Sequence, residues 1–138
     1  NYRSMYARLA NSLIEEGQEE KAKEALDKCM ESIPHESILL NFSAAGIVEA
    51  YYKLGEFDKA NDIALKLMEV YSQEIEYYAR LSRTQISRLG NEPEIAMSVL
   101  QKLLILARVH DQQEILETIE SRFDEIETKY MQSPVSRN

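Results

Sequence analysis

Two glycines in the same sequence frame constrain the fold of this chain most strongly. Gly17 and Gly55 each stand between two stretches with apolar residues at helical spacing, and each is followed five residues later by an alanine, Ala22 or Ala60. A helical pattern that breaks at a glycine, restarts and later recurs describes an antiparallel helix pair. Such a pair buries its apolar face only by stacking on a copy of itself. We therefore predict an all-α fold of stacked helical hairpins.

The composition is consistent with this fold and argues against two classes of function, nucleic-acid binding and membrane insertion. The 138 residues suffice for one domain, and four glycines and three prolines are too few for the many tight turns of a β-sandwich. A formal net charge of −8 opposes binding to nucleic acid and to anionic membrane surfaces, because both need concentrated Lys and Arg. The longest uncharged stretch, from Ser37 to Val48, is far shorter than the roughly 20 apolar residues that cross a bilayer. We expect no nucleic-acid partner and no membrane insertion of this segment.

The apolar spacing places about three hairpins along the chain. The first covers about 2–33 and ends before Pro34, and the second covers about 38–72 with its turn at Gly55. The third covers about 74–109, with a helix at about 74–89, a break at Gly90 and Pro93 in the first turn of its second helix. All three form a single domain at about 1–130.

The C-terminal segment is predicted to cover the wide apolar surface of the preceding helix. Asp111, with Glu114 three residues later, is expected to cap a helix at about 111–130. Its apolar residues follow at alternating spacings of three and four and form a narrow seam: Leu116, Ile119, Phe123, Ile126 and Tyr130. We expect a monomer with this helix as the cap of the stack, and the alternative is a dimer through the same seam. Residues 131–138 lack periodicity and are expected to form a flexible tail.

The first hairpin resembles the tetratricopeptide repeat family. The matching positions are Tyr6, Leu9, Ala10, Leu13, Gly17, Ala22, Leu26, Cys29 and Pro34. The second copy departs from the pattern, with Ala44 at the large aromatic position and Ser72 instead of proline, so that its second helix is expected to run longer or to join the next with little break. The third keeps little beyond Gly90 and Ala96. The resemblance implies a right-handed α-α superhelix of about seven helices that binds a protein or peptide.

A second resemblance concerns the segment from Ala7 to Glu36 together with residues 49–55 and 76–78. These segments are similar to the soluble C-terminal region of a bacterial family of multi-pass membrane proteins related to protein O-mannosyltransferases. That resemblance implies an accessory domain attached to a bacterial inner-membrane protein, with the chemistry outside this chain. It carries no catalytic residue onto this sequence.

In the tetratricopeptide family the first helix of each pair lines a concave groove. The corresponding candidate partner contacts are Asn11, Glu49, Tyr52, Tyr77, Arg80, Thr84 and Arg88. The alternative is that these are ordinary solvated side chains. Asn11 fits one position of the clamp that some family members use for a carboxylate, but Glu49 would repel that ligand. Adjacent tyrosines cannot share a helix face, so in the pairs at 51–52 and 77–78 one ring is expected to pack and the other to lie nearer solvent.

No catalytic, cofactor-binding or metal-binding residue is predicted. His110 and Glu114 stand four residues apart, but two ligands without a third do not make a zinc site. His35 has no second histidine nearby, and Cys29 occupies a core position where burial would leave an unreactive thiol. We therefore predict a non-catalytic module for protein interaction or scaffolding, with the glycosyltransferase accessory domain as the alternative.

Overall fold

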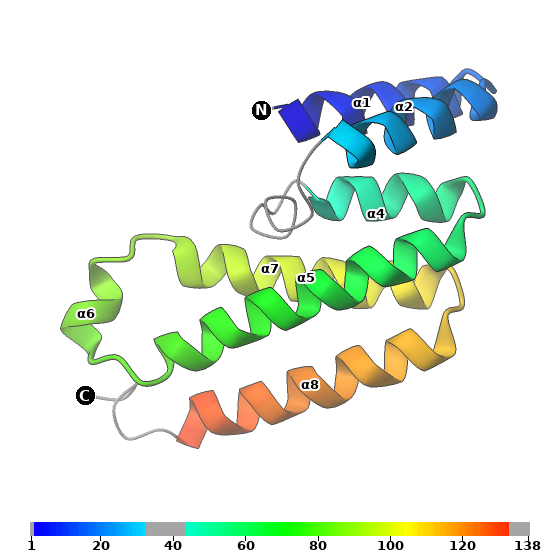
Figure 1. Cartoon of the computed structure of the whole chain (residues 1–138). Helices are drawn as coiled ribbons and strands as arrows, with labels where there is room; N and C mark the ends of the chain where they lie inside the picture. Colours follow the sequence, from blue (N-terminus) through cyan, green and yellow to red (C-terminus); the bar gives the residue numbers. More distant parts are fainter. Residues whose placement is uncertain (1, 33–43, 133–138) are drawn as a thin grey trace. The chain divides into compact units, whose positions relative to one another are not determined.

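A computed structural model of the chain describes residues 2–32 and 44–132. These residues form seven α-helices, and no strand occurs among them (Figure 1). The all-α prediction is confirmed. Pro34, His35 and residues 133–138 of the expected flexible tail lie outside the described residues, whereas residues 131–132 belong to the C-terminal helix.

The chain has two compact units, and the single domain at about 1–130 stays a prediction. Unit 1 is Asn1–Leu67 and unit 2 is Met68–Asn138. The boundary falls inside the longest helix, α5, which runs over Phe57–Tyr78.

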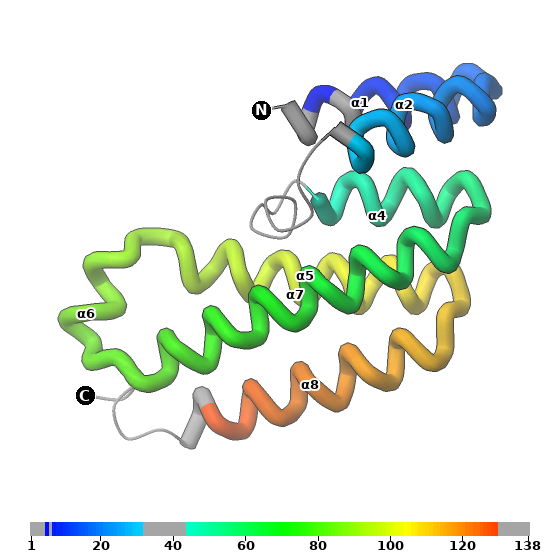
Figure 2. The backbone as a smooth tube through the Cα atoms, viewed as in Figure 1, coloured from blue at the N-terminus to red at the C-terminus, as the bar shows by residue number. Residues whose placement is uncertain are grey.

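Unit 1 consists of α1 (Tyr2–Glu15), α2 (Glu19–Ser32), α4 (Ala44–Lys53) and the first half of α5. Helix α1 packs against both α2 and α4 (Figure 2). The crossing of α1 and α4 is close because small residues meet there: a Cβ added to Gly46 would lie 3.2 Å from Cβ of Ala7. The core of this unit contains Leu26, Cys29, Ile47 and Tyr51, all at most 1% exposed.

A polar network joins the two hairpins of unit 1 beside this core. The hydroxyl of Tyr51 on α4 donates to Oδ1 of Asp27 on α2 at 2.7 Å. Nζ of Lys59 on α5 donates to the same oxygen at 3.0 Å and lies 5.7 Å from the centre of the Tyr51 ring. Lys23 and Glu56 form an ion pair at 2.5 Å. Burial, followed by the hydrogen bond to Asp27, raises the pKa of Tyr51 above its ordinary value.

Unit 2 consists of the second half of α5, α6 (Arg83–Ser87), α7 (Glu92–Val109) and α8 (Gln113–Gln132). Pro93 lies in the first turn of α7, as predicted. Helices α7 and α8 pack against each other. The seam residues Leu116, Ile119 and Ile126 are buried within the single chain. A dimer through this seam would need the same residues to be exposed.

The expectation that the second helix of the second hairpin runs longer is confirmed, whereas the expected helix at about 74–89 is wrong. Helix α5 continues past residue 72 to Tyr78, because Ser72 stands where the repeat pattern has a helix-breaking proline. Within the remaining stretch, 79–89, only Arg83–Ser87 are helical and form the separate helix α6. Ser82 begins α6 with a capping box, in which its hydroxyl accepts from the Gln85 backbone and the Gln85 side chain accepts from the Ser82 backbone.

Three hairpin turns in the chain share one hydrogen-bond pattern. After Gly17, N–H of Gln18 donates to the carbonyl of Leu13, and the same bond to the carbonyl five residues earlier follows Gly55 and Asp111. All three residues have positive φ, 80°, 77° and 55° respectively. This pattern is the Schellman motif, which closes a helix C-terminus. The turn between α7 and α8 is thus built like the two glycine turns, with aspartate in the glycine position.

This finding corrects two predictions about the third hairpin. The turn that repeats the first two lies between α7 and α8, whereas Gly90 lies between the short α6 and α7. Asp111 was expected to cap α8, but an N-cap residue needs an extended backbone, and Asp111 has φ 55°. Its side-chain oxygen Oδ1 accepts from Nε2 of Gln113 instead, at 3.1 Å.

We expect the left-handed backbone of Asp111 to decide the effect of substitutions there. Asp111→Gly should raise the free energy of unfolding by up to about 1 kcal/mol, because glycine adopts this conformation without strain. Asp111→Val should lower it by about 1–2 kcal/mol, because a β-branched residue is poorly tolerated at positive φ. Urea unfolding followed by circular dichroism measures both, and Gln113→Ala controls for the lost side-chain hydrogen bond. Equal stability of the glycine and valine variants would contradict the assigned geometry.

Candidate functional site

Three of the predicted groove positions, Asn11, Glu49 and Tyr52, lie on α1 and α4, the first helices of the two hairpins of unit 1. Two of them, Asn11 and Glu49, contact Lys53, which was not predicted. Nζ of Lys53 on α4 donates to Oδ1 of Asn11 on α1 at 3.1 Å and lies 3.7 Å from Oε2 of Glu49, one turn earlier on α4. Nδ2 of Asn11 donates to the backbone carbonyl of Ala7 at 2.8 Å. We call Asn11, Glu49 and Lys53 the α1/α4 face. Asn11 and Glu49 are half-buried and Lys53 is exposed, so the face presents an amide, a carboxylate and an ammonium group at the surface.

The local sequence explains why these groups meet. Glu49 and Lys53 are four residues apart on one helix and therefore share a face. The contact between Gly46 and Ala7 holds α4 close to α1, and Asn11 lies one turn beyond Ala7. Lys53 was missed by sequence reasoning, although its spacing from Glu49 was a usable signal. Its positive charge offsets the repulsion that Glu49 alone would exert on an anionic ligand.

Tyr52 lies behind this face rather than on it. The residue is only 2% exposed, and its hydroxyl donates to Oδ1 of Asn61 at 2.5 Å. Its ring packs at a tilt against Phe57, with 6.2 Å between the ring centres. Burial raises the pKa of Tyr52 above its ordinary value. Tyr52 thus holds α4 against α5 and contributes to the shape of unit 1.

The prediction for adjacent tyrosines is correct for one pair and wrong for the other. Tyr78 is 4% exposed and Tyr77 55% exposed, with their rings packed edge to face. Tyr51 and Tyr52 are both buried. The reason is that α4 has neighbours on two sides: Tyr51 reaches Asp27 on α2, and Tyr52 reaches Asn61 on α5.

The other predicted contacts, Tyr77, Arg80, Thr84 and Arg88, belong to unit 2. Tyr77 is on α5, Arg80 follows the end of that helix, Thr84 is in α6 and Arg88 is its C-cap residue. All four are exposed. They lie along the end of α5 and the short α6 and not on one continuous helix, because the expected helix at about 74–89 is divided in two.

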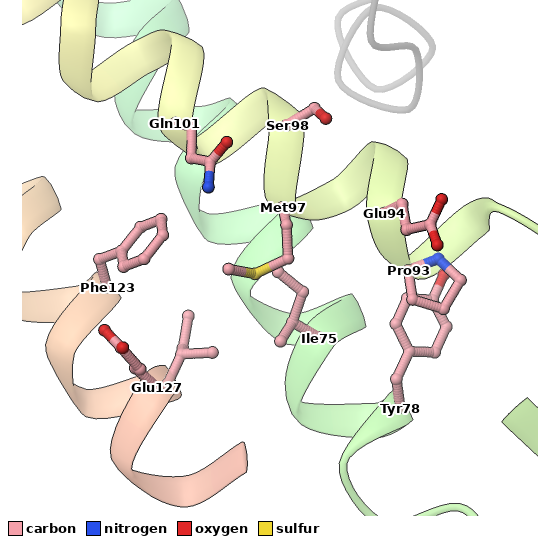
Figure 3. A pocket seen from close by; sticks show the side chains of 10 residues that line it. Ile75, Tyr78, Pro93, Glu94, Met97, Ser98, Gln101, Phe123 and Glu127 are labelled. Carbon is pink, nitrogen blue, oxygen red and sulfur yellow. The ribbon is translucent and has the colours of Figure 1, made fainter. Parts of the chain in front are cut away.

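A cleft of about 530 Å³ opens in unit 2 between α5, α7 and α8 (Figure 3). We call it the α5/α7/α8 cleft. Its lining residues are Ile75, Tyr78, Pro93, Glu94, Met97, Ser98, Gln101, Phe123, Ile126 and Glu127. Figure 3 shows Ile75, Met97 and Phe123 converging from the three helices. Sequence reasoning missed this cleft because its walls come from segments far apart in the chain.

Charged side chains hold α5 against α8 next to this cleft. Glu76 on α5 pairs with Arg122 and with Lys129 of α8, the latter at 3.4 Å. Burial alone would raise the pKa of Glu76, but the charges of Arg122 and Lys129 outweigh burial and hold the pKa below its ordinary value. The hydroxyl of Tyr78 donates to Oε1 of Glu74 at 2.8 Å. Burial, with Glu74 and Glu92 nearby, raises the pKa of Tyr78.

Residues 2–32 and 44–132 contain no group of three or more His, Cys, Asp or Glu side chains arranged to hold a metal ion. Within the same ranges, no helix combines the length and apolarity required to cross a membrane. His110 is the C-cap of α7, and its carbonyl accepts from Nε2 of Gln112.

Comparison with known proteins identifies one repeat. Residues 7–34 match the family model of the tetratricopeptide repeat. The match covers 28 of the 138 residues, so that it identifies a tetratricopeptide-like segment within the first hairpin of a chain whose described residues are helical. No curated protein and no solved structure matches the chain.

Proposed function

We propose that this chain is a non-catalytic protein-interaction module of tetratricopeptide type, and that its α1/α4 face binds a segment of a partner protein. The observation that carries the proposal is the contact between Lys53 and Asn11, which connects the first helices of two hairpins through groups that hydrogen-bond peptides. The repeat match over residues 7–34 covers most of the first of these hairpins. Repeats of this kind stack into surfaces that bind other proteins.

The chemistry of the face suits an extended peptide. Lys53 supplies an ammonium group for a carboxylate or a backbone carbonyl, and Glu49 accepts a backbone N–H or a cationic side chain. Asn11 both donates and accepts, and its contacts with Ala7 and Lys53 fix the orientation of its amide. Because Lys53 already contacts both Asn11 and Glu49, little conformational entropy is lost when a partner binds.

The proposal predicts that partner binding depends on Lys53. Lys53→Glu should weaken the binding of proteins captured by the chain about tenfold or more, because a charge-assisted hydrogen bond is replaced by repulsion. Lys21→Glu is the matched control: it makes the same charge change at an exposed position on α2. Surface plasmon resonance with each captured partner measures both variants, and circular dichroism checks that they remain folded. Partners that bind both variants equally would exclude the α1/α4 face.

The alternative, an accessory domain of a membrane glycosyltransferase, stays a prediction from sequence resemblance. The upstream reading frame of the gene tests it most directly. Several hydrophobic segments of about 20 residues before Asn1 would support it, and a short frame without them would end it.

A further inference from the structure

The α5/α7/α8 cleft is a second surface, which the proposed function does not use. Its floor is apolar: Ile75 and Ile126 are buried, and Met97 and Phe123 are half-buried. Its rim is acidic, because Glu94 and Glu127 are exposed and lie on opposite sides of the apolar side chains (Figure 3). None of the described residues that line it is cationic.

The dimensions of the cleft match a short helix. On α7 its lining positions extend from Pro93 to Gln101 at helical spacing. At about 1.5 Å per residue this wall is about 12 Å long, or roughly two helical turns. Two turns of a helix present apolar anchors at i, i+3 or i+4 and i+7, which is the pattern that such grooves receive.

The charges around the cleft determine which sign of charge a partner segment must carry. Glu94 and Glu127 form no ion pair with any residue that the structure describes, so both carboxylates are available at the rim. Glu74 and Glu92 add negative charge near Tyr78 at one end of the cleft. The neighbouring cations Arg122 and Lys129 are engaged by Glu76 on α5. A cationic segment is therefore attracted, and an anionic one repelled.

We propose that the α5/α7/α8 cleft binds a short, basic amphipathic helix of a partner protein. Its apolar side chains fill the cleft between Ile75, Met97 and Phe123, and its Lys or Arg side chains pair with Glu94 and Glu127. A small apolar molecule would fill the floor but leave both rim carboxylates without a role. This binding does not depend on the α1/α4 face.

The charge requirement is tested on the full chain with two labelled helical peptides, one of leucine and lysine and the other of leucine and glutamate. Fluorescence anisotropy should show binding of the lysine peptide and at least about tenfold weaker binding of the glutamate peptide. The double variant Glu94→Lys with Glu127→Lys should weaken the binding of the lysine peptide by about tenfold or more. The matched control, Glu24→Lys with Glu120→Lys, changes net charge equally at exposed positions outside the cleft and should change binding by less than about threefold.

The apolar requirement is tested separately. Gln101 is exposed and lines the cleft, so that Gln101→Trp should obstruct it without disturbing the core and should abolish peptide binding. Ile105→Trp introduces the same ring at an exposed position of α7 outside the cleft and should have no effect. Circular dichroism checks the fold of each variant. Lys53→Glu should also leave this binding unchanged, which distinguishes the cleft from the α1/α4 face.

Three outcomes would overturn the proposal. Equal weakening by the two charge variants would mean a general attraction of basic peptides to an acidic chain. Unchanged binding by a folded Gln101→Trp variant would place the peptide elsewhere. Binding of an apolar fluorescent dye in the cleft, without binding of either peptide, would make the cleft a small-molecule site.

Discussion

Replacing Ser72 with proline is expected to lower the free energy of unfolding by about 3 kcal/mol or more. The residue lies inside α5, where proline removes a backbone hydrogen bond and its ring clashes with the carbonyl four residues earlier. The substitution restores the residue that the repeat pattern has at this position, so a simple sequence comparison would favour it. Urea unfolding followed by circular dichroism measures the loss.

Ser72→Ala is the matched control at the same site. The side chain of Ser72 is fully buried, and its hydroxyl has no hydrogen-bond partner among the described residues. Removing this hydroxyl should leave stability unchanged or raise it by up to about 1 kcal/mol, because a buried unsatisfied group is lost and alanine favours the helix. If the proline variant is as stable as the alanine variant, α5 does not continue through this position.

Tyr51→Ala is expected to lower the free energy of unfolding by about 3–5 kcal/mol, the range for large aromatic residues removed from a core. The residue is 1% exposed, and its truncation leaves a cavity beside α2 and α4. It also removes the hydroxyl that donates to Asp27. Tyr51→Phe keeps the ring and should cost only about 1–2 kcal/mol, because the carboxylate of Asp27 retains Lys59.

Tyr77→Ala provides the control for the aromatic truncation. Tyr77 is 55% exposed, so the same chemical change should cost less than about 1 kcal/mol. Native-state hydrogen exchange would assign the loss in Tyr51→Ala to the amides of unit 1. A cost at Tyr51 no larger than at Tyr77 would be incompatible with the buried position of its ring.

The cleft illustrates what the sequence could not reveal. Ile75 and Met97 are recognisable as apolar residues on helices, and Glu127 as part of an acidic helix face. Whether such residues close over a core or leave a gap depends on how far apart three helices pack, and that distance has no signature in any one segment. The α1/α4 face is an intermediate case: Asn11 and Glu49 were found from the repeat frame, and Lys53 was not.

The sequence alone determined the helical fold and the positions of the turns at Gly17 and Gly55. It could do so because both signals are local properties of the chain: the helical spacing of apolar residues, and glycines at 17 and 55 that adopt the left-handed backbone conformation. The tertiary structure decided the third turn, where Asp111 takes the conformation of a glycine, and the end of α5 at Tyr78 before the separate helix α6. It also decided the burial of both Tyr51 and Tyr52. At these positions the intrinsic preference of a residue is weak, and packing against neighbouring helices sets the outcome.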